Sequence, residues 1–182
     1  MKDFKESNIN IVKESINTMN HIASTSEIVS KKAAHIVCGF LAEKQGDVKF
    51  KQLAQTALTS ISELVTPSFV IKQMLKVAAT AKSPNVLKEA SLTISYFIDE
   101  FSIAVAGGMP LKEIIDYSKI ACAHSNPAVR NASMEMLKKL YENVGEPLRN
   151  FLTDIKESTL KIIEDEFNKT KPLGKDEIAP KR

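Results

Sequence analysis

Two cysteines and three histidines are the residues of this sequence best suited to bind a metal or to act in catalysis. Cys38 and Cys122 are far apart in the chain, and His21, His35 and His124 lie on three different segments. A structural zinc site needs four ligands, and a nucleophile needs a neighbouring base; the spacing supplies neither. The sequence also has no glycine-rich phosphate loop and no G-x-S-x-G motif. We therefore expect no metal, no cofactor and no enzymatic activity, and we interpret both thiols as small buried hydrophobic groups.

The composition is that of an ordinary globular chain. Of its 182 residues, 43% are hydrophobic and 26% are charged. No run approaches the roughly 18 apolar residues of a membrane span, and the first residues have no signal-peptide core. The formal net charge of +3 equals the excess in residues 169–182, which contain five basic and two acidic residues. We expect a cytoplasmic protein without a membrane partner and without specific nucleic-acid binding.

Apolar residues recur at steps of three and four along most of the chain, which predicts amphipathic helices and an all-α fold. The segment from Ile94 to Val105 is rich in residues that also suit a strand, but its spacing favours a helix. Pro67, Pro84 and Pro127 each follow a Thr, Ser or Asn, as expected at helix starts. In the same way, Asp154 and a glutamate three residues later predict a capping box.

The predicted helices form a repeat. Helices that follow a short polar turn begin near residues 8, 49, 85 and 127, roughly 40 residues apart. Two helices per unit at this period are typical of HEAT-repeat solenoids, in which helical pairs bury their apolar faces by stacking. We therefore predict a HEAT-repeat helical-pair solenoid. Ile9, Ile11, Val12 and Ile16 give the first helix a wide apolar surface, from which we expect further repeats in front of it.

Charge divides unequally between the two kinds of connection in such a solenoid. The turns inside the pairs hold eight basic and three acidic residues, in windows 1–8, 44–51, 82–88 and 123–130. The links between the pairs hold one basic and six acidic residues, in windows 23–28, 63–69, 99–111 and 142–149. This pattern predicts a basic edge suited to docking on an acidic protein surface. The alternative is a chance scatter of surface lysines.

Three segments near the end of the chain resemble a known family. They are Asn126-Pro-Ala-Val-Arg130, Asn143-Val-Gly-Glu-Pro-Leu-Arg149-Asn-Phe151 and Ile162-Ile-Glu-Asp-Glu-Phe167. They are similar to the end of a TOG domain, as found in the large microtubule polymerases of the mini spindles and tumour-overexpressed-gene type. The resemblance implies a TOG-like domain at 1–168, lacking its first repeats, and a basic linker or tail at 169–182.

The resemblance also implies a partner and a site. TOG domains bind αβ-tubulin through their intra-pair turns, which corresponds to the basic edge. The residues that the resemblance and the charge pattern assign to tubulin binding are Lys5, Lys49, Lys51, Lys82, Ser83, Lys88, Asn126 and Arg130. For Arg130 a structural role and a contact role are both open, and Asn126 also suits a helix cap. The implied location is the microtubule cytoskeleton, including spindle poles or the centrosome.

The sequence departs from the family in one respect that leaves a second function open. TOG domains usually present a tryptophan on their first turn, and this chain has none. The alternative function is a HEAT scaffold that contacts another protein, or other domains of the same large protein, without binding tubulin. Fold membership alone does not decide between the two.

Overall fold

The computed structural model describes residues 8–104, 107–174 and 178. Within these ranges the structure is helical and contains no strand. The elements are α1 (Ile9–Thr25), α2 (Lys31–Lys44), α3 (Lys51–Leu64), α4 (Pro67–Thr80), α5 (Pro84–Phe101), α6 (Leu111–Cys122), α7 (Pro127–Val144), η1 (Glu146–Phe151) and α8 (Glu157–Lys169). The chain divides into two compact units, Met1–Val86 and Leu87–Arg182, with the boundary inside α5.

Local capping chemistry explains where several helices begin. Thr66 accepts a hydrogen bond from the Phe69 N–H at the start of α4, and Asn126 accepts one from the Ala128 N–H at the start of α7. A proline follows each cap, because a first helical residue needs no N–H donor. The helix starts predicted at Pro67, Pro84 and Pro127 are therefore confirmed.

The capping box predicted at Asp154 is wrong. Helix α8 begins at Glu157, and its N-cap residue is Lys156, which makes no side-chain capping bond. Asp154 instead forms an ion pair with Lys119 of α6, with 2.6 Å between Oδ1 and Nζ. The Asp154 side chain, which the local pattern assigned to the helix end, forms a tertiary contact instead.

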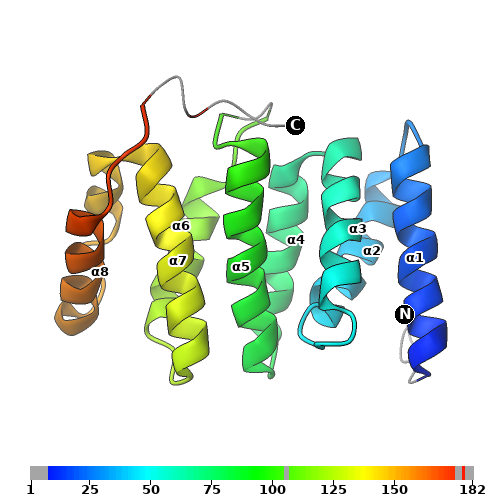
Figure 1. Ribbon diagram of the computed structural model, residues 1–182, viewed down its shortest axis with the longest axis horizontal. Helices are drawn as coiled ribbons and strands as arrows, with labels where there is room; N and C mark the ends of the chain where they lie inside the picture. Colours follow the sequence, from blue (N-terminus) through cyan, green and yellow to red (C-terminus); the bar gives the residue numbers. More distant parts are fainter. Residues whose placement is uncertain (1–7, 105–106, 175–177, 179–182) are drawn as a thin grey trace. The chain divides into compact units, whose positions relative to one another are not determined.

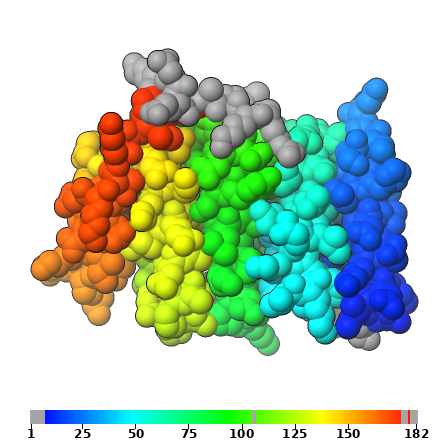
Figure 2. Space-filling model, in the orientation of Figure 1, coloured from blue at the N-terminus to red at the C-terminus, as the bar shows by residue number. Residues whose placement is uncertain are grey.

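The first unit consists of two layers of helices. Helix α1 packs on α3, and α2 packs on α4, so that consecutive helices alternate between the layers (Figure 1). Figure 2 shows the layer formed by α1 and α3, in blue and cyan. Fully buried aliphatic side chains fill the space between the layers, including Ile16, Leu41, Leu58 and Ile71.

The first helix keeps apolar residues on its exposed side. Val12 and Ile16 are buried, whereas Ile11 and Ile22 are 50% and 53% exposed. The outer face of α1 is therefore not fully polar. The expectation of further repeats in front of this helix stays a prediction.

Polar contacts, one buried and one exposed, connect α5, α6 and α7 in the second unit. The Tyr117 hydroxyl of α6 donates to the Leu87 carbonyl of α5 at 2.6 Å. Lys139 of α7 pairs with Asp99 of α5 at 3.3 Å. Helix α5 runs to Phe101, which confirms the helix prediction from Ile94 to that point. The prediction is wrong for residues 102–104, which are not helical because Ser102 has a positive φ of 61°, and Val105 lies outside the described residues.

An aromatic stack attaches α8 to α7. The rings of Tyr141 and Phe167 lie 4.2 Å apart and 14° from parallel. The Arg149 guanidinium of η1 lies 5.2 Å and 5.6 Å from the two ring centres and also pairs with Glu146 and Glu164. One arginine thus connects η1 to both neighbouring helices through charge-assisted and cation–π contacts.

The chain after α8 turns back along the second unit. The Leu173 N–H donates to the Glu142 carbonyl at 2.7 Å, and the Ser102 hydroxyl donates to the Ile178 carbonyl at 2.5 Å. The described part of the predicted linker therefore contacts the links between helical pairs, which are acidic. Whether a separate tail begins at residue 169 stays a prediction.

Candidate functional site: the turns inside the helical pairs

The turn between α2 and α3 is held in shape by one aspartate. The Asp47 carboxylate accepts the Lys49 N–H at 2.9 Å, and the Asp47 carbonyl accepts the N–H groups of Phe50 and Lys51. Such an Asx turn fixes the backbone by local hydrogen bonds. The side chains of Val48 and Lys49 project from its tip, where Val48 is 79% exposed.

Gly46 brings this turn against the beginning of α5. A Cβ atom at residue 46 would lie 2.5 Å from the Val86 Cγ2 atom, a distance at which one of the two must move. The close approach places the α2–α3 turn beside the α4–α5 turn, which carries Lys82 and Ser83, both exposed. The first unit therefore presents two neighbouring basic turns.

The lysines predicted for this site differ in how accessible their charges are. Among the described residues, the ammonium groups of Lys49 and Lys82 have no ion pair. Lys51 is half-buried as the first residue of α3. Lys88 is also half-buried, lies in the second turn of α5 and pairs with Glu89 at 3.0 Å, so it is a weaker candidate. Lys5 lies outside the described residues.

The second unit contributes the turn between α6 and α7. Asn126 caps α7, and its own N–H donates to the His124 Nδ1 atom at 3.0 Å. The Arg130 Nη1 atom donates to the carbonyls of His124 and Ser125, both at 2.8 Å. Val129, the residue before it, is fully buried. The valine is therefore structural, and the arginine stabilises the turn while its side chain remains exposed.

The structure groups the predicted residues by unit. Lys49, Lys82 and Ser83 lie at one end of the first unit, and Asn126 and Arg130 share one turn of the second. The prediction missed Val48 and Gly46. The signal for Val48 was an apolar residue between Asp47 and Lys49 in an otherwise polar turn. Gly46 had no such signal, because its close approach to Val86 is a tertiary contact.

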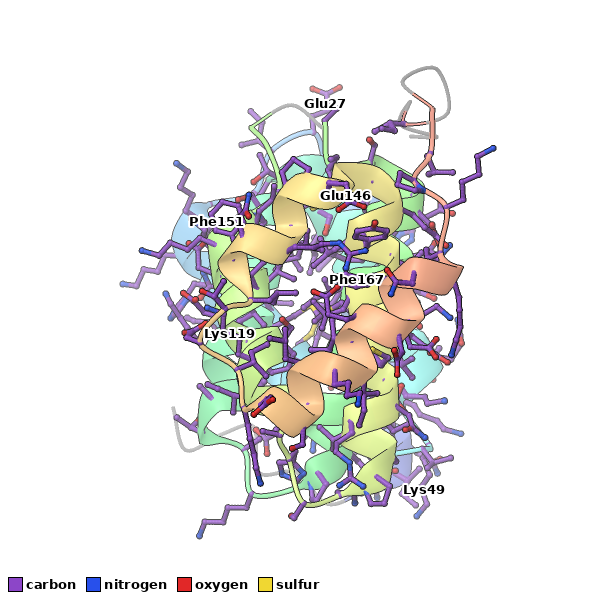
Figure 3. The ribbon with its side chains drawn as sticks, turned by 90° about the vertical axis from the view of Figure 1, so that its left-hand side faces the viewer. Glu27, Lys49, Lys119, Glu146, Phe151 and Phe167 are labelled. Carbon is purple, nitrogen blue, oxygen red and sulfur yellow. The ribbon has the colours of Figure 1, made fainter. Side chains whose placement is uncertain are left out.

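The links between the pairs carry the opposite charge. In the first unit, Glu27 and Lys49 lie at opposite ends of the helices (Figure 3). In the second unit, Glu146 accepts a hydrogen bond from the Tyr141 hydroxyl, and this bond with the nearby Arg149 lowers the Glu146 pKa. The described part of the first unit is thus basic at the turns inside the pairs and acidic at the links. In the second unit the α6–α7 turn carries the positive charge of Arg130, and the links carry an excess of acidic residues.

The possible metal ligands of the described residues do not form a cluster. No group of three His, Cys, Asp or Glu side chains within the described ranges is placed to hold a metal ion. Both cysteines are buried, and burial raises the Cys38 pKa to about 12, which keeps its thiol protonated. No helix of the described structure is long and apolar enough to cross a membrane.

Within each unit the helices are paired and joined by exposed turns, as in a HEAT-repeat solenoid. The TOG domain family of XMAP215, Dis1 and CLASP matches residues 4–167, so the chain belongs to this family. The third TOG domain of mini spindles from Drosophila melanogaster has the same fold, with a TM-score of 0.82 and 24% identity over 98% of this chain and 75% of that one.

Two further similarities concern longer proteins. The chain is 30% identical to MOR1 from Arabidopsis thaliana over 180 residues, which are 98% of this chain and 9% of MOR1. Its fold is also similar to part of a structure of microtubule polymerases with TOG domain arrays, which concerns tubulin recruitment and assembly. That likeness has a TM-score of 0.74 and 18% identity, over 97% of this chain and 37% of the other.

Proposed function

We propose that this chain is a microtubule-associated module that binds αβ-tubulin through the turns inside its helical pairs and so supports microtubule growth or spindle organisation. The observation that carries the proposal is the pair of exposed lysines, Lys49 and Lys82, on neighbouring turns of the first unit. Family membership supports the same partner, since a TOG-array polymerase of this fold recruits tubulin. The chain acts as a binding module without catalysis.

Charge and shape have separate roles in this proposal. The two lysines attract the acidic tubulin surface and orient the encounter, while Val48 supplies an apolar contact at the tip of the turn. In the second unit, Arg130 offers a further positive charge on a turn that the same side chain stabilises. The proposed location follows from the partner: microtubules, and with them spindle poles or the centrosome.

The test is co-elution of the chain with αβ-tubulin on size exclusion, at low and at physiological salt. The double variant Lys49→Glu/Lys82→Glu reverses both charges at the proposed edge. The matched control is Lys31→Glu/Lys32→Glu, which makes the same charge change at the opposite end of α2, about 20 Å away. Both control lysines are exposed. We expect affinity to fall about tenfold or more in the first variant only.

The remaining outcomes decide against the proposal in different ways. Equal loss in both double variants would show that net charge, and not the edge, controls binding. Absence of co-elution at either salt would remove tubulin binding from this chain and favour a HEAT scaffold that contacts a different protein.

A further inference from the structure

The last helical pair begins with an unusually short element. The 3₁₀ helix η1 has 6 residues and spans about 12 Å, whereas α6 has 12 residues and spans about 18 Å. In the first unit, the corresponding helices α2 and α4 have 14 residues each and pack on one another. The short element leaves part of the apolar flank of α6 uncovered.

A pocket of about 380 Å³ lies between α6 and η1. Ile115 and Leu148 form its buried floor, and Leu111 and Val144 form its part-buried walls. Phe151 lies on its rim with 57% of its surface exposed. The volume is in the range of ligand pockets, and it accommodates a large aliphatic or aromatic side chain.

The two ends of the pocket carry opposite charge. Lys112 is exposed at one end and has no ion pair among the described residues. At the other end, Lys119 lies between two carboxylates, at 2.6 Å from Asp154 and 4.0 Å from Asp116. One end therefore presents the Lys112 ammonium group, and the other carries two carboxylates against one ammonium group. In Figure 3, Lys119 and Phe151 lie on the same side of this unit.

We propose that this pocket docks an amphipathic helix of a partner protein, with a carboxylate, a large apolar residue and a basic residue at positions i, i+4 and i+7. Lys112 and Lys119 are seven residues apart on α6, or about 10.5 Å along its axis. Seven residues of a partner helix cover the same distance, so its two charges meet the two ends while the apolar side chain fills the pocket.

Other occupants fit these features less well. A peptide that binds as an added β-strand needs an exposed sheet edge, and the described structure has none. A small molecule confined to the apolar floor would leave the two charged ends, about 10 Å apart along α6, without partners. The opposite charges also fix the direction of the partner helix, because a reversed helix would place like charges together.

The probe is a fluorescein-labelled helical peptide of roughly 18 residues with the Glu, Leu, Lys pattern, and its control exchanges the Glu and the Lys. Anisotropy titrations with the full chain measure the affinity of each. We expect the first peptide to bind at least about tenfold more tightly than the second. Lys112→Glu should reduce or reverse this preference.

Two similarly exposed apolar residues provide a matched pair for the pocket itself. Phe151 is 57% exposed on the pocket rim, and Ile162 is 58% exposed on α8, outside the pocket. Phe151→Ala should lower the affinity for the first peptide by about fivefold or more, and Ile162→Ala should leave this affinity unchanged. Circular dichroism melts of each variant check that the chain is folded, and the exposed Lys112→Glu variant keeps the test valid if Phe151→Ala is unstable.

Three results would overturn the proposal: no binding of the first peptide at about 1 mM, equal affinity for both peptides, or equal effects of Phe151→Ala and Ile162→Ala. Tubulin co-elution with Lys112→Glu serves as an independent readout. It should match that of the unaltered chain, because the pocket shares no residue with the basic turns.

Discussion

The turn between α2 and α3 passes so close to α5 that residue 46 has no room for a methyl group. In Gly46→Ala, the new Cβ would lie 2.5 Å from Val86 Cγ2 and 3.2 Å from the Val86 nitrogen. Val86 is 6% exposed, and its N–H donates to the Ser83 carbonyl at 3.1 Å, so it cannot retreat without disturbing the neighbouring turn. Gly46 is not among the positive-φ glycines, so the effect is steric.

The expected loss follows from two opposing contributions. Overpacking at a close contact destabilises a protein by about 1–3 kcal/mol. Replacing glycine by alanine also lowers the conformational entropy of the unfolded chain, which stabilises the folded state by about 0.4–1 kcal/mol. We expect Gly46→Ala to lower the free energy of unfolding by about 1–2 kcal/mol and the melting temperature by about 2–8 °C.

A second glycine provides the matched control. Gly39 lies inside α2, and a Cβ added there would meet no atom within 4 Å. Alanine favours a helix interior over glycine by about 0.5–1 kcal/mol, so Gly39→Ala should raise the stability. The same chemical change is therefore expected to have opposite signs at two positions seven residues apart.

Urea unfolding followed by far-ultraviolet circular dichroism measures both variants. Tubulin co-elution, at a temperature where both are folded, then tests the turn as a binding element: it should weaken in Gly46→Ala and persist in Gly39→Ala. The packing argument would be refuted if Gly46→Ala were as stable as the unaltered chain. It would also be refuted if both substitutions changed the free energy of unfolding in the same direction.

Three further substitutions test single contacts. Arg149→Lys keeps the charge but removes the planar guanidinium that contacts η1, α7 and α8. Thermal melts should therefore show a free energy of unfolding lower by about 1–2 kcal/mol. An unchanged melt would show that the stack of Tyr141 and Phe167 is sufficient to hold α8 on α7. Asn126→Ala should lose about 1 kcal/mol in urea titrations and Asn126→Asp much less, because only alanine removes the cap. The ion pair with Lys119 lowers the Asp154 pKa in the folded chain, so its stabilisation is present above the unfolded pKa and is lost as pH falls through the folded pKa. The stability difference between the unaltered chain and Asp154→Asn should therefore shrink between about pH 7 and about pH 3, and a constant difference would contradict this.

The helix starts were predictable because their causes are local. Pro67 and Pro127 each follow a capping side chain, and the structure starts α4 and α7 at these residues. The repeat was predictable for a related reason, since helical periodicity and turn residues together fix the length of a pair. These signals lie within a few residues of the feature that they determine.

The sequence could not predict contacts that depend on packing. Asp154 satisfies the pattern of a helix cap, but an ammonium group 35 residues earlier in the chain lies 2.6 Å away and takes its carboxylate. Lys82 and Lys88 were equivalent in the charge pattern, yet Lys82 lies on a turn and Lys88 pairs with its neighbour on a helix. The helix that packs on a given helix decides which of its faces is buried. Local sequence rules do not predict that packing.

The residues that form the proposed site are also the residues that end and begin helices, and this limits which substitutions report on binding. Asn126 caps a helix, Arg130 holds two turn carbonyls and Asp47 shapes its turn, so replacing any of them changes the backbone that presents the site. Lys49 and Lys82 differ, because within the described structure their ammonium groups form no ion pair. A loss of tubulin binding in those two lysine variants is therefore evidence about the interface itself, whereas the same loss in an Arg130 variant would combine a missing charge with a displaced turn.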